Sequence, residues 1–130
     1  MNYIMLWWSL SKIKSGKEKA RNRAVKRLCR ARDARAVRPL ISMLEDESAY
    51  VRAAAAFALG GICDAQAIQP LLATLNDANE EVRDAAALAL GMIKDEHSGH
   101  QLVPLLKSKD SAVRVEAEEK LKALGSEWLG

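Results

Sequence analysis

Residues 50–62 read YVRAAAAFALGGI, and this stretch decides the fold. It returns 31 residues later, at 81–93, as EVRDAAALALGMI, and a more divergent copy at 112–124 reads AVRVEAEEKLKAL. Self-similarity at a fixed period of about 20–50 residues is the sequence signature of a repeat solenoid. Within the stretch, Val51, Ala55 and Leu59 recur at helical spacing, which predicts an α-helix with one buried face.

A second apolar pattern precedes each of these helices. Between positions 37 and 44, apolar residues follow the i, i+3, i+4, i+7 spacing of an amphipathic helix. Asp33 is suited to cap this helix, because its carboxylate can accept backbone N–H groups. Pro39 fits best within the first turn, where a missing N–H costs little. Asp64 and Pro70 repeat the arrangement 31 residues later, so each repeat is predicted to be a helical hairpin.

The 31-residue register divides the chain into repeats that we expect to form one domain. These are a degenerate N-terminal repeat at 1–31, further repeats at 32–62, 63–93 and 94–124, and a short tail at 125–130. The predicted fold is all-α, a right-handed α-solenoid of about four helical hairpins. Pro104 is displaced by three places, which predicts a short or kinked helix and a looser linker over residues 95–100. Gly60 and Gly61 predict either close approach of a neighbouring backbone or an early helix end.

The complete pattern resembles a known family. It reads Asp-x-x-Ala-[Val/Ile]-x-Pro-Leu-[Ile/Leu], followed by Asp-x4-Val-Arg-x-x-Ala-Ala-x-Ala-Leu-Gly-x-Ile. Over about residues 31–124 this is similar to the HEAT-like repeat of the type named after phycobilisome lyase subunits. The resemblance implies an α-solenoid but no particular function, since unrelated activities share this architecture.

The resemblance also implies a structural role for the arginine that follows the valine at the start of each second helix. In such repeats this arginine bonds an aspartate of the preceding turn, so Arg52 would pair with Asp46 and Arg83 with Asp77. A structural ladder of this kind is favoured over a functional row of arginines.

Charge is distributed unevenly along the chain. Residues 1–38 contain 12 of the 20 Lys and Arg and two acidic residues, a formal charge of +10. Residues 39–130 contain 8 basic and 15 acidic residues, a formal charge of −7. An asymmetry of this size is a clue to a charged partner.

Neither a membrane-spanning helix nor a cleaved signal peptide is expected. The longest strongly apolar run, residues 3–8, is much shorter than the roughly 20 residues that span a bilayer. Lysines follow this run, whereas a secretory signal places positive charge before it. Cys29 and Cys63 lack metal-ligand spacing, which favours inert thiols in a reducing compartment. We expect a cytoplasmic protein, with peripheral membrane association as an option.

The second helices carry a further stripe, separate from the buried one. In a HEAT-like stack these helices line the concave side, so successive stripes are expected to form one surface. The surface grades from basic, through apolar, to acidic along the chain, as expected of a groove for a partner. The predicted partner-binding groove consists of Tyr50, Phe57, Glu81, Asp84, Leu88, Met92 and Glu119. The alternative is that Phe57 and Leu88 merely pack against each other.

The N-terminal helix has more apolar residues than one buried face can hide. Residues 3–8 read YIMLWW, although the ends of solenoids normally carry a polar outer face. Three interpretations stay open: packing against the chain itself, including the basic helix that follows; self-association or a partner contact; and insertion into an anionic membrane surface. The predicted N-terminal contact consists of Trp7, Trp8, Arg23, Lys26 and Arg30.

Other chemistry is disfavoured by the sequence. The basic segment 12–38 could bind phosphate backbones, but a solvated face is favoured, so nucleic acid is not an expected partner. His97 and His100 share one segment without identifiable further ligands, so no metal site is predicted. There is no Gly-rich phosphate loop and no hydrolase elbow, and we expect neither a catalytic residue nor a cofactor.

These observations favour a non-catalytic scaffold or adaptor that binds another protein through the concave face of the solenoid. The first alternative is an accessory or lyase-type subunit resembling the phycobilin lyases, which leaves an enzymatic role open. A further alternative is peripheral membrane or nucleic-acid binding through the basic N-terminal segment.

Overall fold

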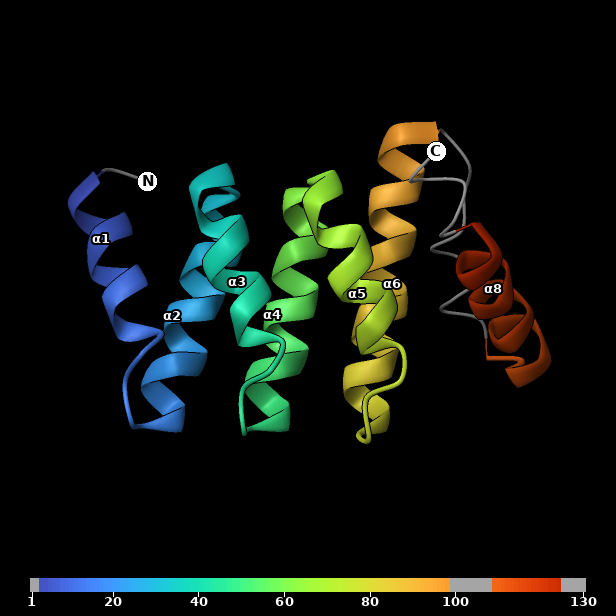
Figure 1. Cartoon of the computed structure of the whole chain (residues 1–130), viewed down its shortest axis with the longest axis horizontal. Coiled ribbons are helices and arrows are strands. Elements are labelled where there is room, and N and C mark those ends of the chain that lie inside the picture. The colour runs from blue at the N-terminus through green and yellow to red at the C-terminus, as the bar shows by residue number, and fades with distance from the viewer. Residues whose placement is uncertain (1–2, 99–108, 125–130) are drawn as a thin grey trace.

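The computed structural model describes residues 3–98 and 109–124, and this part of the chain contains helices and turns but no strand. The helices pair into hairpins that stand side by side along the long axis of the molecule (Figure 1). They are α1 (Tyr3–Lys12), α2 (Glu18–Ala31), η1 (Ala34–Ala36), α3 (Val37–Met43), α4 (Ala49–Ile62), η2 (Ala65–Ala67), α5 (Ile68–Thr74), α6 (Glu80–Ser98) and α8 (Ser111–Leu124). The predicted all-α solenoid is confirmed. The expected helix around Pro104 and the tail lie outside the described residues.

The second helix of each hairpin begins at a regular interval. These helices start at Glu18, Ala49, Glu80 and Ser111, each 31 residues after the last. The first helices of the second and third hairpins open with a 3-10 turn. Asp33 and Asp64 cap these turns, because their carboxylates accept the backbone N–H two residues later at 2.9 and 2.8 Å.

The end of α6 differs over residues 95–98 from the predicted loose linker at 95–100, of which residues 99 and 100 lie outside the described part of the chain. Helix α6 continues to Ser98, whereas α2 and α4 end earlier, at residues Arg32 and Cys63 with positive φ values of 49° and 59°. After each of those two ends the chain returns to the core through a buried alanine, which is Ala36 after α2 and Ala67 after α4. Ser98 occupies the position that corresponds to Ala67 in the repeat register.

The second helices pack directly on one another, α2 on α4 and α4 on α6. Small side chains permit this approach, and at Gly60 the backbone of α6 comes close to α4. A Cβ at Gly60 would lie 2.7 Å from the Cα of Ala89. The prediction that this glycine allows a neighbouring backbone to approach is confirmed. The first helices α3 and α5 share few contacts, so the stack is closer on the side of the second helices.

The core is a continuous layer of aliphatic side chains between the first and second helices. Its fully buried leucines are Leu28, Leu40, Leu59, Leu71 and Leu90. The inward positions predicted for the second hairpin are buried except for Ile41, which, like Ile62, is half-buried against the same core. None of the described helices is both long enough and apolar enough to cross a membrane.

Two arginines tie successive hairpins together. Arg21 of α2 donates from Nε and a terminal nitrogen to the carboxylate of Asp46, at 2.9 and 3.1 Å. Arg52 of α4 binds Asp77 in the same way, at 2.9 and 3.2 Å. All four side chains are at least four-fifths buried. Such two-pronged, charge-assisted hydrogen bonds are strong and fix the relative position of the two hairpins.

The predicted pairing of each arginine with the aspartate carboxylate of its own repeat is therefore wrong. The carboxylate that binds Arg52 belongs to the turn of the following repeat, not to Asp46 of its own turn. Arg52 reaches its own turn through the backbone only, since a terminal nitrogen donates to the Asp46 carbonyl at 2.8 Å. Arg83 likewise donates to the Asp77 carbonyl at 2.7 Å. These contacts agree with the structural interpretation of the arginine row.

Candidate functional site

We call the outward side of α2, α4, α6 and α8 the second-helix face. Two aromatic rings are exposed in the middle of this face. Tyr50 and Phe57 lie on α4, seven residues apart and thus two helical turns apart on one side, and they are 69% and 50% exposed. Leu88 and Met92 of α6 are half-buried, because part of each side chain packs into the stack. Phe57 keeps half of its surface exposed, so the alternative, packing against Leu88, covers only part of the ring.

Charged residues flank these rings on the neighbouring helices. Glu81 and Asp84 are exposed on α6, and Glu119 is exposed on α8. Lys26 and Arg30 are exposed on α2. The second-helix face thus changes from positive on α2 to negative on α6 and α8, with the aromatic pair of α4 between them. A contribution of these residues to partner binding stays a prediction.

The N-terminal helix is only partly covered. Leu6 is buried, but Ile4 is 75% exposed and Trp7 is 61% exposed. Trp8 packs against the basic helix that follows, as one of the three interpretations predicts. Its ring lies 5.0 Å from the guanidinium carbon of Arg27, measured to the ring centroid, and it retains 46% exposure. The two tryptophans therefore differ in their environment, because Trp8 packs against its own chain whereas Trp7 faces outward.

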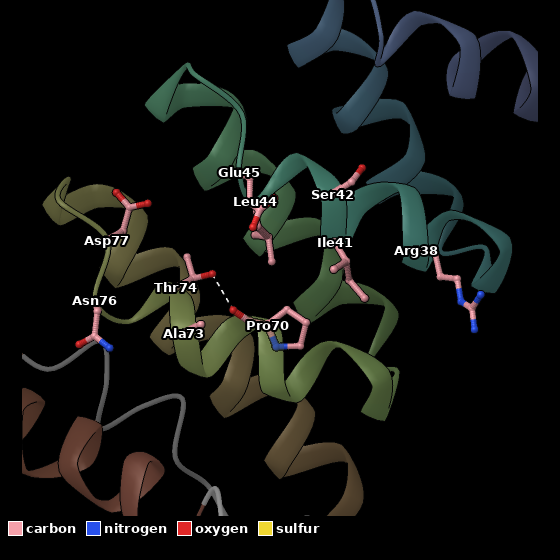
Figure 2. Close-up of a pocket in the computed structure, with 10 residues that line it drawn as sticks. All are labelled: Arg38, Ile41, Ser42, Leu44, Glu45, Pro70, Ala73, Thr74, Asn76 and Asp77. Atoms are coloured by element: carbon pink, nitrogen blue, oxygen red, sulfur yellow. Dashed lines mark hydrogen bonds between the residues drawn. The ribbon is translucent and has the colours of Figure 1, made fainter.

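The structure also contains a cavity that the sequence did not reveal. It has a volume of about 590 Å³ and lies between α3 and α5, on the side away from the second helices (Figure 2). Figure 2 shows Arg38 at one end and Asp77 at the other, with Ile41, Pro70 and Ala73 between them. The cavity arises because the first helices stand apart, a distance that depends on packing rather than on any local motif.

Two polar side chains that line this first-helix cavity are engaged with the chain itself. The hydroxyl of Thr74 donates to the Pro70 carbonyl at 2.7 Å, so it is engaged with its own helix. The Asp77 carboxylate is already bound by Arg52. Its lining residues are Arg38, Ile41, Ser42, Leu44, Glu45, Pro70, Ala73, Thr74, Asn76 and Asp77, which include no histidine, cysteine or lysine.

The two cysteines lack the features of nucleophiles. Burial raises the pKa of the Cys29 thiol and also that of the Cys63 thiol, so both favour the protonated form. The Cys63 thiol donates to the Gly60 carbonyl at 3.0 Å. No group of three or more His, Cys, Asp or Glu side chains comes together within the described residues in a way that could hold a metal ion. His100 lies outside those residues, as does the side chain of His97.

Comparison with known proteins places the chain in a family. The HEAT repeats family matches residues 8–75 and 37–122, which together span most of the chain. The chain therefore belongs to the HEAT repeat family, and the resemblance noted in the sequence is confirmed. No curated protein matches the sequence.

The solved structures that are similar to this chain include a lyase complex and an engineered protein. One is the complex of CpcE and CpcF of phycocyanin lyase from Nostoc sp. PCC7120, which is 30% identical with a TM-score of 0.66 and covers 79% of this chain. This chain corresponds to only 42% of that one, so it spans less than half of the protein it matches. The other is an engineered protein, 22% identical with a TM-score of 0.56, covering 97% of this chain and 69% of its own. The second similarity concerns the fold alone.

Proposed function

We propose that this chain is a non-catalytic scaffold or adaptor that binds another protein through its second-helix face. The observation that carries the proposal is the exposure of Tyr50 and Phe57 on one side of the central helix α4. Aromatic rings are enriched at protein interfaces, and they often dominate the binding energy there. A solvent-exposed pair in the middle of a helical layer is consistent with a contact site.

The flanking charges suggest what the partner looks like. The basic side chains of Lys26 and Arg30 lie on α2, and the acidic side chains of Glu81 and Asp84 lie on α6. A partner with an apolar centre, an acidic end facing α2 and a basic end facing α6 would complement this arrangement. Charge complementarity of this kind mainly sets orientation and the rate of association.

A pull-down with matched variants tests the proposal. Phe57→Glu places a charge in the centre of the proposed contact, and we expect the wild-type partners to be lost. Gln69→Glu adds the same charge on α5, where Gln69 is exposed, and should leave capture unchanged. Circular dichroism verifies that both variants are folded. If every partner captured by the wild type persists with Phe57→Glu, the second-helix face is the wrong surface.

A lyase-type accessory subunit is the second candidate. It is supported by the 30% identity with the phycocyanin lyase structure over 79% of this chain. In this case a similar surface would hold a bilin chromophore or a protein that carries one. Added bilin would then shift in absorbance and quench the tryptophan fluorescence of this chain. Unchanged spectra over a full titration would exclude the bilin-binding form of this candidate.

Contact through the N-terminal helix is a third candidate, supported by the outward-facing side chains of Ile4, Met5 and Trp7. Self-association through this helix would make the sedimentation coefficient rise with protein concentration. We expect Trp7→Ser to abolish that rise. A coefficient that is independent of concentration in the wild type would contradict self-association.

A further inference from the structure

Four cationic side chains converge on one cavity at the N-terminal hairpin. The cavity has a volume of about 360 Å³. Its lining residues are Trp8, Lys12, Ser15, Lys17, Ala20, Arg23, Ala24 and Arg27. No acidic side chain is among them. Within residues 3–98 and 109–124, none of the four cations forms an ion pair.

The contrast with Arg21 shows that this lack of carboxylates is local. Arg21 lies on the same helix as Arg23 and Arg27, but it is buried against Asp46 of the next repeat. On the cavity side two of the four cations, Lys12 and Arg27, lie over the ring of Trp8 instead. The Nζ of Lys12 lies 5.2 Å from the centroid of the Trp8 ring, and the guanidinium carbon of Arg27 lies 5.0 Å from it. Cation–π contacts orient both side chains without neutralising their charge.

The repeat register indicates that Arg23 and Arg27 are not there for packing. Thirty-one residues later, α4 carries Ala54 and Ala58 at these positions, and α6 carries Ala85 and Ala89. In those helices the alanines belong to the stacking side, where Ala89 meets Gly60 of the preceding second helix. On α2 the same side carries two long guanidinium groups, both of which line the cavity.

Like charges that lie close together repel one another, and an anion bound between them would reduce this repulsion. Two guanidinium forks and two ammonium groups form a donor set suited to the several oxygens of a phosphate group. The Ser15 hydroxyl accepts the Lys17 N–H at 3.2 Å, so its own proton can still be donated. Backbone N–H groups can also contribute to anion binding. Helix α2 has no side-chain cap at Lys17, so the first N–H groups of the helix are available at the end where Lys17 lines the cavity.

We propose that the cavity between α1 and α2 binds a small phosphate-bearing anion. Its volume is near the lower end of ligand cavities, which extend from roughly 300 to 1,000 Å³. That size suits a compact headgroup rather than a nucleic-acid strand. The same phosphate chemistry occurs in soluble phosphorylated compounds and in lipid headgroups. The exposed Ile4 and Trp7 on the adjoining helix make both sources worth testing.

Calorimetric titration with pyrophosphate tests the site directly. We expect the double substitution Arg23→Ala/Arg27→Ala to weaken binding at least tenfold, because both guanidinium groups line the cavity. The matched control is Lys26→Ala/Arg30→Ala, which removes the same charge from the same helix at exposed positions outside the cavity. Binding by the control should stay within threefold of the wild type. The proposal fails if the wild type does not bind, or if both double variants lose affinity equally.

Vesicles distinguish the two sources of phosphate. Phosphatidylcholine vesicles containing a phosphoinositide are compared with vesicles brought to equal surface charge by phosphatidylserine. A lipid headgroup is the source if phosphoinositide vesicles are preferred, if pyrophosphate displaces the protein, and if Arg23→Ala/Arg27→Ala abolishes binding. A soluble compound is the source if pyrophosphate binds but neither kind of vesicle does. Equal binding to both kinds of vesicle, undisturbed by pyrophosphate, would overturn the proposal in favour of a diffuse charge effect.

Discussion

At the scale of single residues, the aspartates of the turns have two tasks each. Asp77 accepts the Asn79 N–H at 2.9 Å and also binds the guanidinium of Arg52. Asp46 does the same with the Ser48 N–H and Arg21. One side chain therefore shapes the turn before a second helix and joins that turn to the preceding hairpin.

Removing Arg52 should destabilise the fold measurably. Arg52→Ala would remove the guanidinium from the largely buried Asp77 carboxylate and leave the Asp46 carbonyl without its donor. We expect a loss of about 2–3 kcal/mol in the free energy of unfolding. Arg35→Ala is the control, since Arg35 binds Asp33 from a side chain that is half exposed, and such a pair contributes roughly 0–1 kcal/mol. Urea denaturation measures both, and equal losses would contradict a special role for the ladder.

The same aspartate predicts how stability depends on pH. Burial of Asp77 opposes its ionisation, but hydrogen bonds from Asn79 and Arg52 outweigh this and keep its pKa below the usual 3.8. The hydrogen bonds from Arg35 lower the pKa of Asp33 to about 2. A carboxylate with a lowered folded-state pKa stabilises the fold above its unfolded pKa, and this contribution is lost as the pH falls through the folded value.

We therefore expect the melting temperature to fall as the pH is lowered from about 4 towards 2. Asp77→Asn, which cannot titrate, should be less stable at neutral pH and should show a shallower fall over the same interval. Thermal melts followed by circular dichroism provide the comparison. A variant whose melting temperature falls as steeply as that of the wild type would show that Asp77 does not contribute.

At the scale of helices, the contact between α4 and α6 depends on the absence of one side chain. A Cβ at Gly60 would lie 2.7 Å from Ala89 Cα and 2.9 Å from its Cβ, so the two helices would have to move apart. We expect Gly60→Ala to cost about 1–3 kcal/mol. Gly61→Ala is a close control, since its Cβ would meet only the Cys29 sulfur at 4.0 Å. It should be neutral or stabilise by up to about 1 kcal/mol, because alanine favours helix. Similar denaturation midpoints for the two variants would contradict the close approach.

The elements also show which features the sequence could predict. The helix at 50–62 follows from helical spacing, and the close approach at Gly60 was one of two uses that the sequence predicted for the adjacent glycines. The partner of Arg52 does not follow, because Asp46 lies six residues before it and Asp77 lies 25 after it, and only the stacking of hairpins selects between them. The cavity between α3 and α5 likewise depends on how far two helices stand apart.

At the scale of the whole molecule, the described second helices pack on their neighbours in the stack, α2 on α4 and α4 on α6. The candidate sites follow this arrangement: the aromatic pair of Tyr50 and Phe57 lies on the central second helix, and the cationic cavity lies on the N-terminal hairpin. Sequence periodicity predicted the stack well, since it concerns buried positions. It could not separate Trp7 from Trp8, because their exposure depends on whether Arg27 of another helix reaches the ring.

A stack held by neighbour contacts should open locally, and this can be measured. Asp46→Ala removes the carboxylate that joins Arg21 of the first hairpin to the second hairpin. In a linear array this weakens one boundary and leaves the others intact. A loss of about 2 kcal/mol at this boundary should speed amide hydrogen exchange in α2 by roughly 30-fold, with little change in α6.

Asp77→Ala supplies the comparison for this experiment, since it removes the carboxylate that joins Arg52 to the third hairpin. Asp77→Ala should therefore weaken the boundary between α4 and α6 and speed hydrogen exchange in the helices on one side of that boundary. Exchange measured by mass spectrometry on peptides from α2, α4 and α6 resolves the two patterns. If both variants accelerate exchange uniformly along the described helices, the chain unfolds as one cooperative unit, and the ladder stabilises the whole molecule rather than individual boundaries.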